Sequence, residues 1–459
     1  MVEPTVGVGN FIQTAPLAVR DCRWYGFDID GGYVDTAEAV AVSRQLDAHL
    51  RLKSAFELSD CDFPDVDSSS TVLVIGNPPW VTNSGQGLAR AKNLPTKFNR
   101  FGLAGLAAMT GKANFDIAEA IILAAVSALS RAGELRLALL VKRSVALKVA
   151  ENFMRATGSV DLSFSKIDAK RWFAASVDAG LFQMTIRRGL ASTQVIRLFE
   201  AVGAGGPPIL AGMAANRFIQ RLDLYDHAQH IEASSESDVM AWRQGIKHDA
   251  AKVLELRQTP DGLFNGMGEK VDVEPDVLCP LYKSSDLANG RSASRVFPLY
   301  QFDLSGPVEE IGGRWPRLAA YLERNRGQLD ARGSKIYSGK PPYTLFGVGP
   351  YTTAPFKVAV SGLYKTPRFA VLMPSPEGAP PLVDDTCNML AFDNLTHAQQ
   401  VADYLNGPLV SAFLSAVADS AAKRPYTVDV LRRIRNPRAD ESAESALAFE
   451  MGVPYAATP

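Results

Sequence analysis

The sequence predicts an α/β fold with a doubly wound, mostly parallel sheet in its N-terminal part, followed by a mixed, β-rich region. Strand-like and helix-like segments alternate along the first 190 residues, and such alternation favours a parallel sheet with helices on both faces. Residues 71–75 form an uninterrupted aliphatic and β-branched run, which is typical of a strand buried on both faces. From about 242 to 392, short β-branched runs lie among Pro, Gly and Tyr, and these indicate the β-rich region.

Each element of the N-terminal part follows from a local pattern. The expected elements are, in order, a very short strand before a glycine-bearing loop at 3–11, a strand at 25–30, a helix from about 34 to 52, a strand at 71–75, a helix from about 114 to 129, a strand at 135–141, a further helix, and strands at 160–164 and 181–186. Gly133 stands where a helix C-cap belongs. Ligands of such sheets bind beyond the carboxyl ends of the strands, so the residues at those ends are the candidates for function.

Length and composition exclude several classes of protein. The chain has 459 residues, enough for two or three domains, and its 48 Lys and Arg balance 49 Asp and Glu. Its four cysteines lie far apart, so we expect neither a disulfide framework nor a metal site, and a reducing compartment. The start of the chain lacks a signal-peptide pattern, and the longest apolar stretch, 117–129, contains Glu119. We therefore predict a cytoplasmic protein without a membrane partner.

The charge is unevenly distributed along the chain. Residues 1–67 contain 12 acidic and 5 basic side chains, whereas residues 84–190 contain 16 basic and 7 acidic ones. A basic segment attracts phosphates, although solvated surface charge would give the same pattern.

Acids and glycines follow three successive predicted strands. Glu3 precedes Gly7 and Gly9, Asp28 and Asp30 close the next strand, and Asp62 with Phe63 follows later. Glycines let the backbone approach a ligand closely, an acid at a strand end can bind ribose hydroxyls, and an acid beside an aromatic ring suits the edge and face of adenine. Together these positions indicate a cofactor that contains adenosine.

A fourth motif, Asn77-Pro78-Pro79-Trp80, directly follows the buried strand. The combination resembles the amino-methyltransferases that use S-adenosylmethionine to modify adenine in DNA, whose hallmark is Asp, Asn or Ser followed by Pro-Pro and an aromatic residue. The order of motifs is that of the subgroup with the cofactor motifs first and target recognition last. The resemblance implies a Rossmann-like class I methyltransferase fold. It also implies S-adenosylmethionine contacts at Glu3, Pro4, Thr5, Gly7, Gly9, Phe11, Asp28, Asp30, Asp62, Phe63 and Asn77.

The resemblance also assigns the reaction to the Asn77–Trp80 loop. The amino nitrogen of adenine is a poor nucleophile because its lone pair is delocalised into the ring. Acceptors on its two N–H bonds, here the Asn77 side chain and the Pro78 carbonyl, would free that lone pair, and the prolines would fix the loop. Trp80 would stack on a base extruded from the duplex. Phe173 is expected to form the opposite wall, with Trp172 as the alternative, and Lys112–Asp116 resembles a family segment after the catalytic loop.

The rest of the chain is expected to recognise the target. We predict a catalytic domain at 1–195, a Gly- and Pro-rich linker at 196–235, a target-recognition region at 236–440 and a flexible tail at 441–459. Basic and aromatic residues in flexible loops suit phosphate contact and base readout. The expected DNA contacts are Lys335, Tyr337, Lys340, Tyr343, Lys357, Lys365, Arg368, Lys423 and Arg424.

These expectations define a function and its alternatives. The chain is predicted to be a site-specific DNA adenine N6-methyltransferase of a restriction-modification or phage-defence system, acting by base flipping. The same loop also serves enzymes that methylate RNA bases or protein glutamine, and a truncated chain that only binds DNA is a third possibility. Because the cofactor loop begins at residue 3, we expect either that the true start lies upstream or that a fused N-terminal nuclease segment has been lost. A restriction endonuclease is an expected partner. Asp384-Asp385 has no lysine at the spacing typical of a nuclease.

Overall fold

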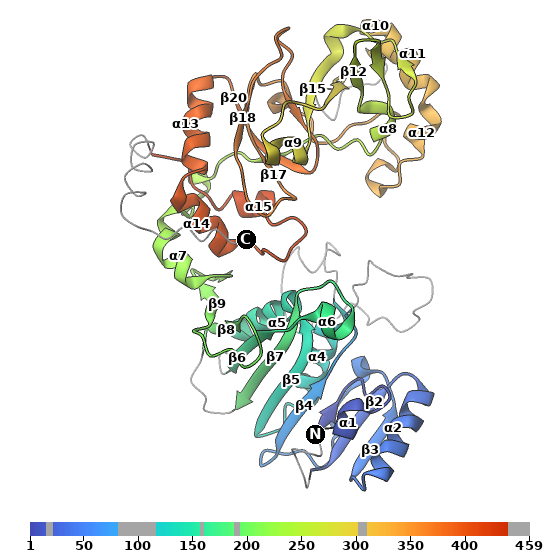
Figure 1. The fold of residues 1–459 in the computed structure, drawn as a ribbon, viewed down its shortest axis with the longest axis vertical. Coiled ribbons are helices and arrows are strands. Elements are labelled where there is room, and N and C mark those ends of the chain that lie inside the picture. The colour runs from blue at the N-terminus through green and yellow to red at the C-terminus, as the bar shows by residue number, and fades with distance from the viewer. Residues whose placement is uncertain (15–21, 81–115, 157–159, 188–192, 302–309, 439–459) are drawn as a thin grey trace. The chain divides into compact units, whose positions relative to one another are not determined.

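The computed structural model describes residues 1–14, 22–80, 116–156, 160–187, 193–301 and 310–438. The chain forms two compact units, Met1–Asp223 and Leu224–Pro459, which are described separately (Figure 1). The predicted tail and most of the Lys112–Asp116 segment lie outside the described residues. Within the described part, no helix is long and apolar enough to cross a membrane.

Ten of the described strands of the first unit form one sheet. In chain order they are β1 (Val2–Glu3), β2 (Trp24–Asp28), β3 (Ala48–Leu52), β4 (Thr71–Gly76), β5 (Glu134–Lys142), β6 (Val160–Lys166), β7 (Ala179–Arg187), β8 (Val195–Phe199), β9 (Ile209–Ala214) and β10 (Arg217–Ile219). Their order in space is β10-β9-β8-β6-β7-β5-β4-β1-β2-β3. The five strands from β3 to β5 are all parallel, and β7 is inserted antiparallel between β5 and β6. This confirms the predicted mostly parallel sheet.

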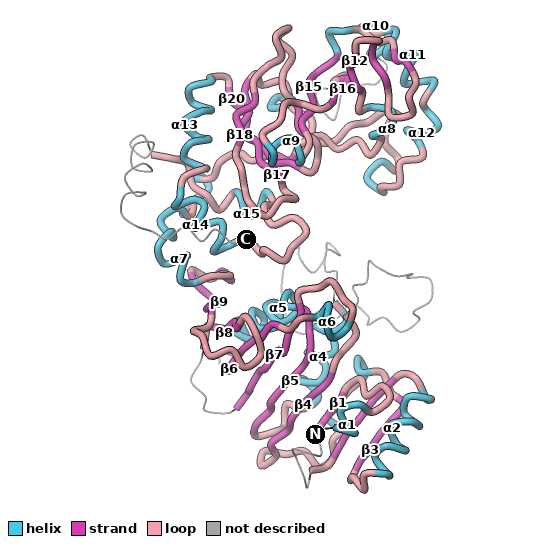
Figure 2. The backbone as a smooth tube through the Cα atoms, viewed as in Figure 1, coloured by secondary structure: helices cyan, strands magenta, loops and turns pink. Residues whose placement is uncertain are grey.

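Helices cover both faces of this sheet (Figures 1 and 2). They are α1 (Asn10–Thr14), α2 (Gly31–Ser43), α4 (Ile117–Ala128), α5 (Arg143–Ala156) and the short α6 (Ala169–Phe173). The alternation of side chains along β4 shows how the layers form. Val72 and Val74 join the core that contains α4 and α5, whereas Ile75 belongs to the core that contains α1 and α2. The continuous apolar run of β4 is therefore explained by burial on both faces.

Two predicted boundaries are wrong. The helix expected to reach residue 52 ends at Ser43, and positive φ at Gln45 turns the chain into edge strand β3. The region of the expected linker at 196–235 instead holds β8 to β10. In β8, Ile196 and Leu198 are buried in the core on alternate positions, and the strand pairs with β6. The Gly- and Pro-rich stretch at 200–208 is the connection between antiparallel β8 and β9.

The second unit is mixed and rich in short strands, as predicted. Its strands are β11 (Arg243–Gln244), β12 (Arg257–Thr259), β13 (Gly262–Phe264), β14 (Lys270–Val271), β15 (Leu278–Tyr282), β16 (Arg295–Pro298), β17 (Phe356–Ser361), β18 (Ala370–Leu372), β19 (Leu382–Val383) and β20 (Cys387–Phe392). They form three sheets, β11-β20-β17-β18, β12-β13-β14 and β16-β15-β19. The helices are α7 (Leu222–Ala228), which begins at the boundary, α8 (Ala251–Leu254), α9 (Ser284–Asn289), α10 (Glu310–Arg314), α11 (Pro316–Arg324), α12 (Arg326–Asp330), α13 (Leu395–Leu405), α14 (Pro408–Val417) and α15 (Val428–Leu431).

Candidate active site

The candidate site lies at the carboxyl edge of the parallel strands in the first unit. β1 pairs with both β2 and β4, so Glu3, Asp28 and Asn77 leave three neighbouring strands at the same edge. Folding therefore brings together residues that the sequence separates by more than seventy positions. This is the edge at which parallel α/β sheets bind their ligands.

The loop after β1 is shaped by its two predicted glycines. Gly7 and Gly9 have φ of +52° and +83°, which favours glycine. A Cβ at Gly9 would lie 3.2 Å from Cα of Ala37 on α2, so this position allows the loop and helix to pack closely. A Cβ at Gly7 would meet nothing within 4 Å. The backbone at Gly7 thus borders open space, as a cofactor loop requires.

Glu3 is the most unusual acid at this edge. It is only 2% exposed, and its Oε2 atom has no hydrogen-bond partner among the described residues. Burial, and to a lesser extent the charge of Asp28, raises the pKa of Glu3 to about 8. The Thr5 hydroxyl nearby in sequence is also buried without a partner. Buried polar groups normally have partners, so these two groups fit a polar ligand that supplies them.

Pro4 and Phe11, the other predicted cofactor residues of the β1 loop, face the protein interior. Pro4 is buried directly after Glu3, and the half-buried ring of Phe11 packs against the core that contains α1 and α2. The packing of Phe11 fixes the end of the loop against this core.

The two aspartates after β2 have different environments. Asp28 accepts hydrogen bonds from the backbone N–H groups of Gly7 and Asp30 at 2.9 and 3.1 Å, so it ties the two loops together. Asp30 is the N-cap of α2 and accepts from the N–H of Gly32 at 2.9 Å. Between them Ile29 is 67% exposed. Sequence reasoning missed this apolar surface, although an isoleucine between two strand-end acids is a signal for it.

The assignment of Phe63 as a stacking surface needs correction. Phe63 is fully buried and packs edge-on against Tyr25 and Phe27, so its ring presents no free face. Asp62, in the 3₁₀ turn η3 (Asp60–Asp62), receives hydrogen bonds from Lys53 Nζ at 2.6 and 2.7 Å. Burial alone would raise the pKa of Asp62, but Lys53 and Ser59 lower it on balance. Ile29 is the better candidate for contact with a flat ring.

The Asn77–Trp80 loop follows β4, and its one polar side chain, Asn77, is exposed. Asn77 and Pro79 are exposed, whereas Pro78 is buried. The Asn77 side chain makes no hydrogen bond within the described residues, so its oxygen is available. The Trp80 indole donates to the Leu140 carbonyl on β5 at 3.0 Å. That bond anchors the end of the loop to the neighbouring strand.

The two predicted base-stacking residues are in contact. The rings of Trp80 and Phe173 have centroids 5.3 Å apart and are inclined at 66°. Phe173 lies at the end of α6 and is 43% exposed, whereas the alternative, Trp172, is 67% exposed and lies beside Arg171. The geometry therefore favours Phe173 over Trp172 as the partner of Trp80. A flat ring would have to separate the two side chains in order to enter between them.

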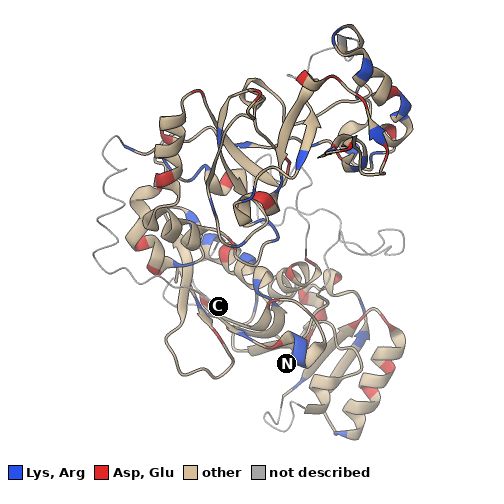
Figure 3. Cartoon of the chain, turned by 45° about the horizontal axis from the view of Figure 1, so that its top comes forward, with Lys and Arg blue, Asp and Glu red and all other residues tan. Residues whose placement is uncertain are grey.

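Three basic residues precede Phe173 in the chain, Lys166 at the end of β6 and Lys170 and Arg171 on α6. Lys166, Lys170 and Arg171 are exposed and form no ion pair with any described residue. Other basic residues of the predicted positive segment are neutralised: Lys142 contacts Asp116 at 2.7 Å, and Lys148 contacts Glu119 at 2.7 Å. Figure 3 shows Lys and Arg interspersed with Asp and Glu over both units. Lys170 and Arg171, on the same helix as Phe173, nevertheless form no ion pair among the described residues.

Two of the predicted DNA contacts in the second unit are wrong. Lys357 on β17 is fully buried, and its ammonium donates to the carbonyls of Thr352 and Ala354 at 3.1 and 2.8 Å. Burial lowers the pKa of Lys357 to about 8. Tyr343 is 9% exposed, and its hydroxyl donates to Glu323. Both residues stabilise the fold and are not available to a nucleic acid.

The other predicted DNA contacts remain at the surface. Lys335, Lys340, Arg368 and Lys423 are exposed, while Tyr337 is half-buried beneath the guanidinium of Arg332. Lys365 is exposed, but its ammonium donates to the carbonyls of Ser420 and Ala422. Arg424 donates to the Asp385 carbonyl at 2.9 Å. No group of three or more potential metal ligands occurs among the described residues.

Comparison with known proteins gives a strong sequence match and a structural match over nearly all of this chain. The chain is 33% identical over 447 residues to the type II methyltransferase M.NspV of Nostoc sp.. The aligned region covers 95% of this chain and 90% of that protein. It resembles the structure of the type IIL restriction-modification enzyme MmeI in complex with DNA, with a TM-score of 0.58 and 12% identity over 98% of this chain. It spans 64% of that enzyme's chain. No protein-family model matches.

Proposed function

The chain belongs to the type II methyltransferases, and on this premise we propose that it methylates the N6 amino group of adenine in a specific double-stranded DNA sequence. S-adenosylmethionine is the methyl donor. One observation carries the proposal: the Asn77–Trp80 loop leaves β4 at the same sheet edge as the Glu3 and Gly7 loop, with Trp80 in contact with Phe173. An acceptor for an amino group, a cofactor loop and an aromatic pair thus lie at neighbouring strand ends.

The residues of the β1 and β2 loops fit the cofactor. The buried, unpartnered Glu3 and Thr5 oxygens suit its amino acid part, and open space beside Gly7 admits it. Asp28, already positioned by two backbone N–H groups, is suited to its ribose hydroxyls. Ile29 offers an apolar surface for its adenine ring. When bound, the cofactor supplies an electrophilic methyl group.

The chain's own groups then act on the target adenine. The Asn77 side-chain oxygen and the Pro78 carbonyl accept hydrogen bonds from the amino group and hold its nitrogen in place. Pro78 and Pro79 restrict the loop backbone, so these acceptors need little reorganisation. The catalytic effect is positioning and electrostatic stabilisation, without a strong general base. The base reaches the loop only after it has left the duplex. Its ring then stacks between Trp80 and Phe173.

Two features support DNA as the substrate. The structural likeness to an enzyme solved with DNA extends over 98% of the chain and so includes the second unit. That unit carries exposed lysines and arginines in loops, which an enzyme that modifies glutamine would not need. The proposed setting is a restriction-modification or phage-defence system, with a restriction endonuclease, separate or fused, as partner. Incubation of duplex DNA with the chain and S-adenosylmethionine should yield N6-methyladenine by nucleoside mass spectrometry; methylation of RNA or protein alone would contradict the proposal.

Trp80→Ala should weaken capture of the flipped base more than it weakens binding of the duplex. Loss of the indole removes a stacking surface worth about 1–3 kcal/mol per base, while phosphate contacts remain. The rise in 2-aminopurine fluorescence at the target position measures extrusion and capture, and fluorescence anisotropy measures duplex affinity. Trp172→Ala is the matched control, because Trp172 is exposed on the same helix as Phe173 but does not contact Trp80. Equal losses in both assays would refute the assignment.

DNA affinity should fall steeply with salt, and the residues beside Phe173 should contribute to the slope. Each phosphate contact adds about 0.9 to the slope of log K against log salt. The double variant Lys170→Ala/Arg171→Ala should therefore reduce the slope by about 1 to 2. Arg136→Ala is the control, since Arg136 is paired with Glu134 near the amino end of β5. An unchanged slope in the double variant would exclude this surface from the interface.

A further inference from the structure

Lys53, which sequence reasoning missed, contacts both acids expected to meet the adenosine part of the cofactor. It directly follows β3, and its backbone N–H donates to the Asp28 carbonyl at 2.8 Å. Its ammonium donates to both carboxylate oxygens of Asp62, at 2.7 and 2.6 Å. Asp28 and Leu52 are register partners in β2 and β3, so Ile29 and Lys53 come next at the carboxyl edge of the sheet. Lys53 therefore links the expected ribose acid to Asp62, beside the apolar surface of Ile29.

The two oxygens of the Asp62 carboxylate differ in their hydrogen bonds. Oδ2 accepts from Lys53 and from the N–H and hydroxyl of Ser59, the latter two at 2.9 and 3.1 Å. Among the described residues Oδ1 accepts only from Lys53, because Arg51 Nη1 lies 3.7 Å away, beyond hydrogen-bond length. A carboxylate oxygen can accept two hydrogen bonds. Oδ1 of this acid, which is 5% exposed, therefore has capacity for one more donor.

The donor next to Oδ1 is the Lys53 ammonium. It has three protons, and the Asp62 oxygens take two of them. The backbone N–H groups of Asp62 and Phe63 are already used, because they donate to the carbonyls of Ser59 and Asp60, both at 3.1 Å. The Lys53 side chain is 26% exposed, so its third proton can reach a ligand. Lys53 and Asp62 thus offer a donor beside an acceptor.

The 3₁₀ turn η3 is held without this ion pair. Arg131 donates to the carbonyls of Asp60 and Phe63 at 2.9 and 3.1 Å, and so fixes the turn from its first residue to the residue after it. Replacing a buried ion pair by apolar groups is often neutral or stabilising. Fold stability therefore does not explain why a lysine contacts a buried acid at this edge of the sheet.

The amino edge of adenine has the complementary pattern. Its amino group at position 6 donates, the neighbouring N1 accepts, and both lie at the end of the ring farthest from the ribose. With the ribose at Asp28, the Lys53 backbone lies beside the sugar, and its side chain carries the ammonium towards the far end. Burial alone would raise the pKa of Asp62, but Lys53 and Ser59 lower it on balance, so the carboxylate acts only as an acceptor. Hypoxanthine, with a carbonyl at position 6 and an N–H at N1, has the reverse pattern.

We propose that Lys53 and Asp62 recognise the cofactor's adenine ring as a donor–acceptor pair, and that Lys53 makes the site selective for adenine. Asp62 Oδ1 accepts from the amino group and Lys53 Nζ donates to N1, while Ile29 contacts the face of the ring. The inference rests on the placement of the cofactor in the proposed function and adds a specificity-determining residue to it. It does not depend on the methyl acceptor.

Calorimetry on the full chain, without DNA, tests the pair. The two probes are S-adenosylhomocysteine and S-inosylhomocysteine, in which hypoxanthine replaces adenine. Wild type should prefer the adenine compound by about 10- to 150-fold, the range for one hydrogen bond to a charged group. Lys53→Met should reduce this preference to about threefold or less, because only the affinity for the adenine compound falls. General damage to the site would instead weaken both compounds equally and leave their ratio unchanged.

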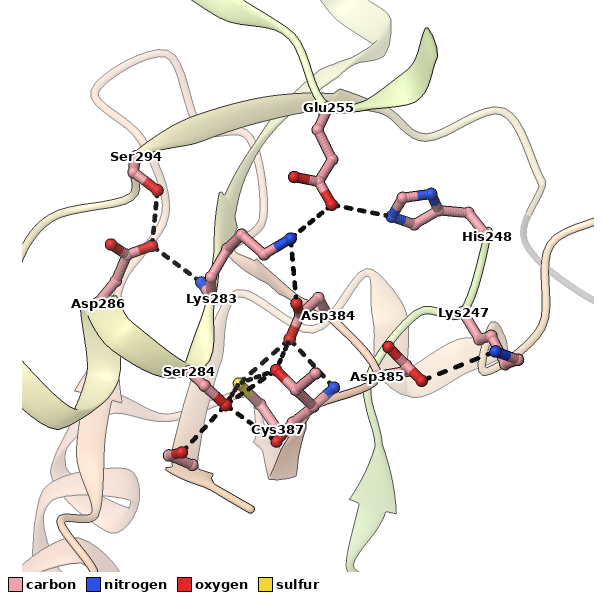
Figure 4. Close-up of polar contacts among 12 residues, drawn as sticks. Lys247, His248, Glu255, Lys283, Ser284, Asp286, Ser294, Asp384, Asp385 and Cys387 are labelled. Carbon is pink, nitrogen blue, oxygen red and sulfur yellow. Dashed lines mark hydrogen bonds and ion pairs between the residues drawn. The ribbon is translucent and has the colours of Figure 1, made fainter. Parts of the chain in front are cut away.

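Lys283→Met is the matched control. Lys283 directly follows β15, as Lys53 follows β3, and its ammonium donates to the Glu255 carboxylate in the second unit at 2.6 Å (Figure 4). The side chains of Lys283 and Glu255 are 31% and 9% exposed, close to the 26% and 7% of Lys53 and Asp62. This substitution also leaves a buried acid without its ammonium partner, but it should keep the wild-type preference.

The outcomes separate this inference from the function on which it rests. An unchanged ratio in Lys53→Met, or equal affinities of wild type for the two compounds, overturns the inference. If Lys53→Met does not fold, Asp62→Asn tests the pair, because an amide can also donate to a carbonyl; its preference should fall to about threefold or less, and an unchanged one overturns the inference. If wild type binds neither compound, the cofactor placement fails, and this inference with it. Methylation of a substrate other than DNA would contradict the proposed function and leave the adenine selectivity intact.

Discussion

Asn77→Ala is expected to reduce methyl transfer by at least about a hundredfold, the size of effect seen when one preorganised polar contact to a transition state is removed. The Asn77 side chain is exposed and makes no hydrogen bond with the described residues, so the substitution should leave the melting temperature unchanged. Cofactor affinity, measured by calorimetry, should stay within about threefold of wild type, because Glu3 and Asp28 remain. Single-turnover kinetics on a saturating duplex would isolate the loss in the methyl-transfer step.

The matched control is Asn77→Asp. A carboxylate preserves the acceptor that the proposed reaction needs, and the family motif admits Asp at this position, so this variant should keep substantial activity. Retention of more than a tenth of wild-type activity by Asn77→Ala would remove Asn77 from the reaction. Equal losses in both variants would mean that the amide acts in some way other than as an acceptor.

Glu3→Gln is expected to have two large effects with opposite signs. Cofactor affinity should fall by about tenfold or more, because a charge-assisted contact is replaced by a neutral one. The unliganded protein, however, should become more stable at pH 8. The pKa of Glu3 in the folded chain is about 8, against an ordinary value of 4.5. Between these values the unfolded chain is ionised and the folded chain is protonated, so rising pH destabilises wild type.

This penalty is absent below about pH 4.5 and complete above about pH 8, where it is on the order of 5 kcal/mol. Urea unfolding without ligand at pH 5 and pH 8 measures it. The stability of wild type should fall between these two values more than that of Glu3→Gln. Glu151→Gln, at a half-exposed acid on α5, is the control and should show the wild-type pH dependence. Identical behaviour of wild type and Glu3→Gln would show that Glu3 is ionised in the free protein.

The raised pKa of Glu3 also predicts that cofactor binding releases a proton. A cationic ammonium group beside Glu3 favours the ionised carboxylate, so binding should release a proton near pH 7. Calorimetry in buffers of different ionisation enthalpy detects this release. Glu3→Gln should abolish it.

The residues at the ends of the parallel strands were the part of the site that could best be predicted from the sequence. Glu3, Gly7, Asp28 and Asn77 could be assigned to one edge because the carboxyl ends of parallel strands coincide there. Phe173 could be placed opposite Trp80 only through a family resemblance, since 93 residues separate the two positions. Their contact in the structure depends on antiparallel β7, which brings the α6 loop to the end of β5.

Burial was harder to predict from sequence. Lys357 looks like a surface cation because burying a lysine is costly, but two carbonyls in the preceding turn satisfy its ammonium. Phe63 and Tyr343 read as binding aromatics, since their packing partners are distant in the chain.

We propose that a rigid loop after β4 presents adenine to the methyl donor in a defined DNA sequence. Single-molecule sequencing with modified-base detection, on DNA from cells that express wild type or Asn77→Ala, tests it most directly. We expect N6-methyladenine at one recurring sequence with wild type and unmodified DNA with the variant. Absence of the mark with wild type, or the same mark with both proteins, would contradict it.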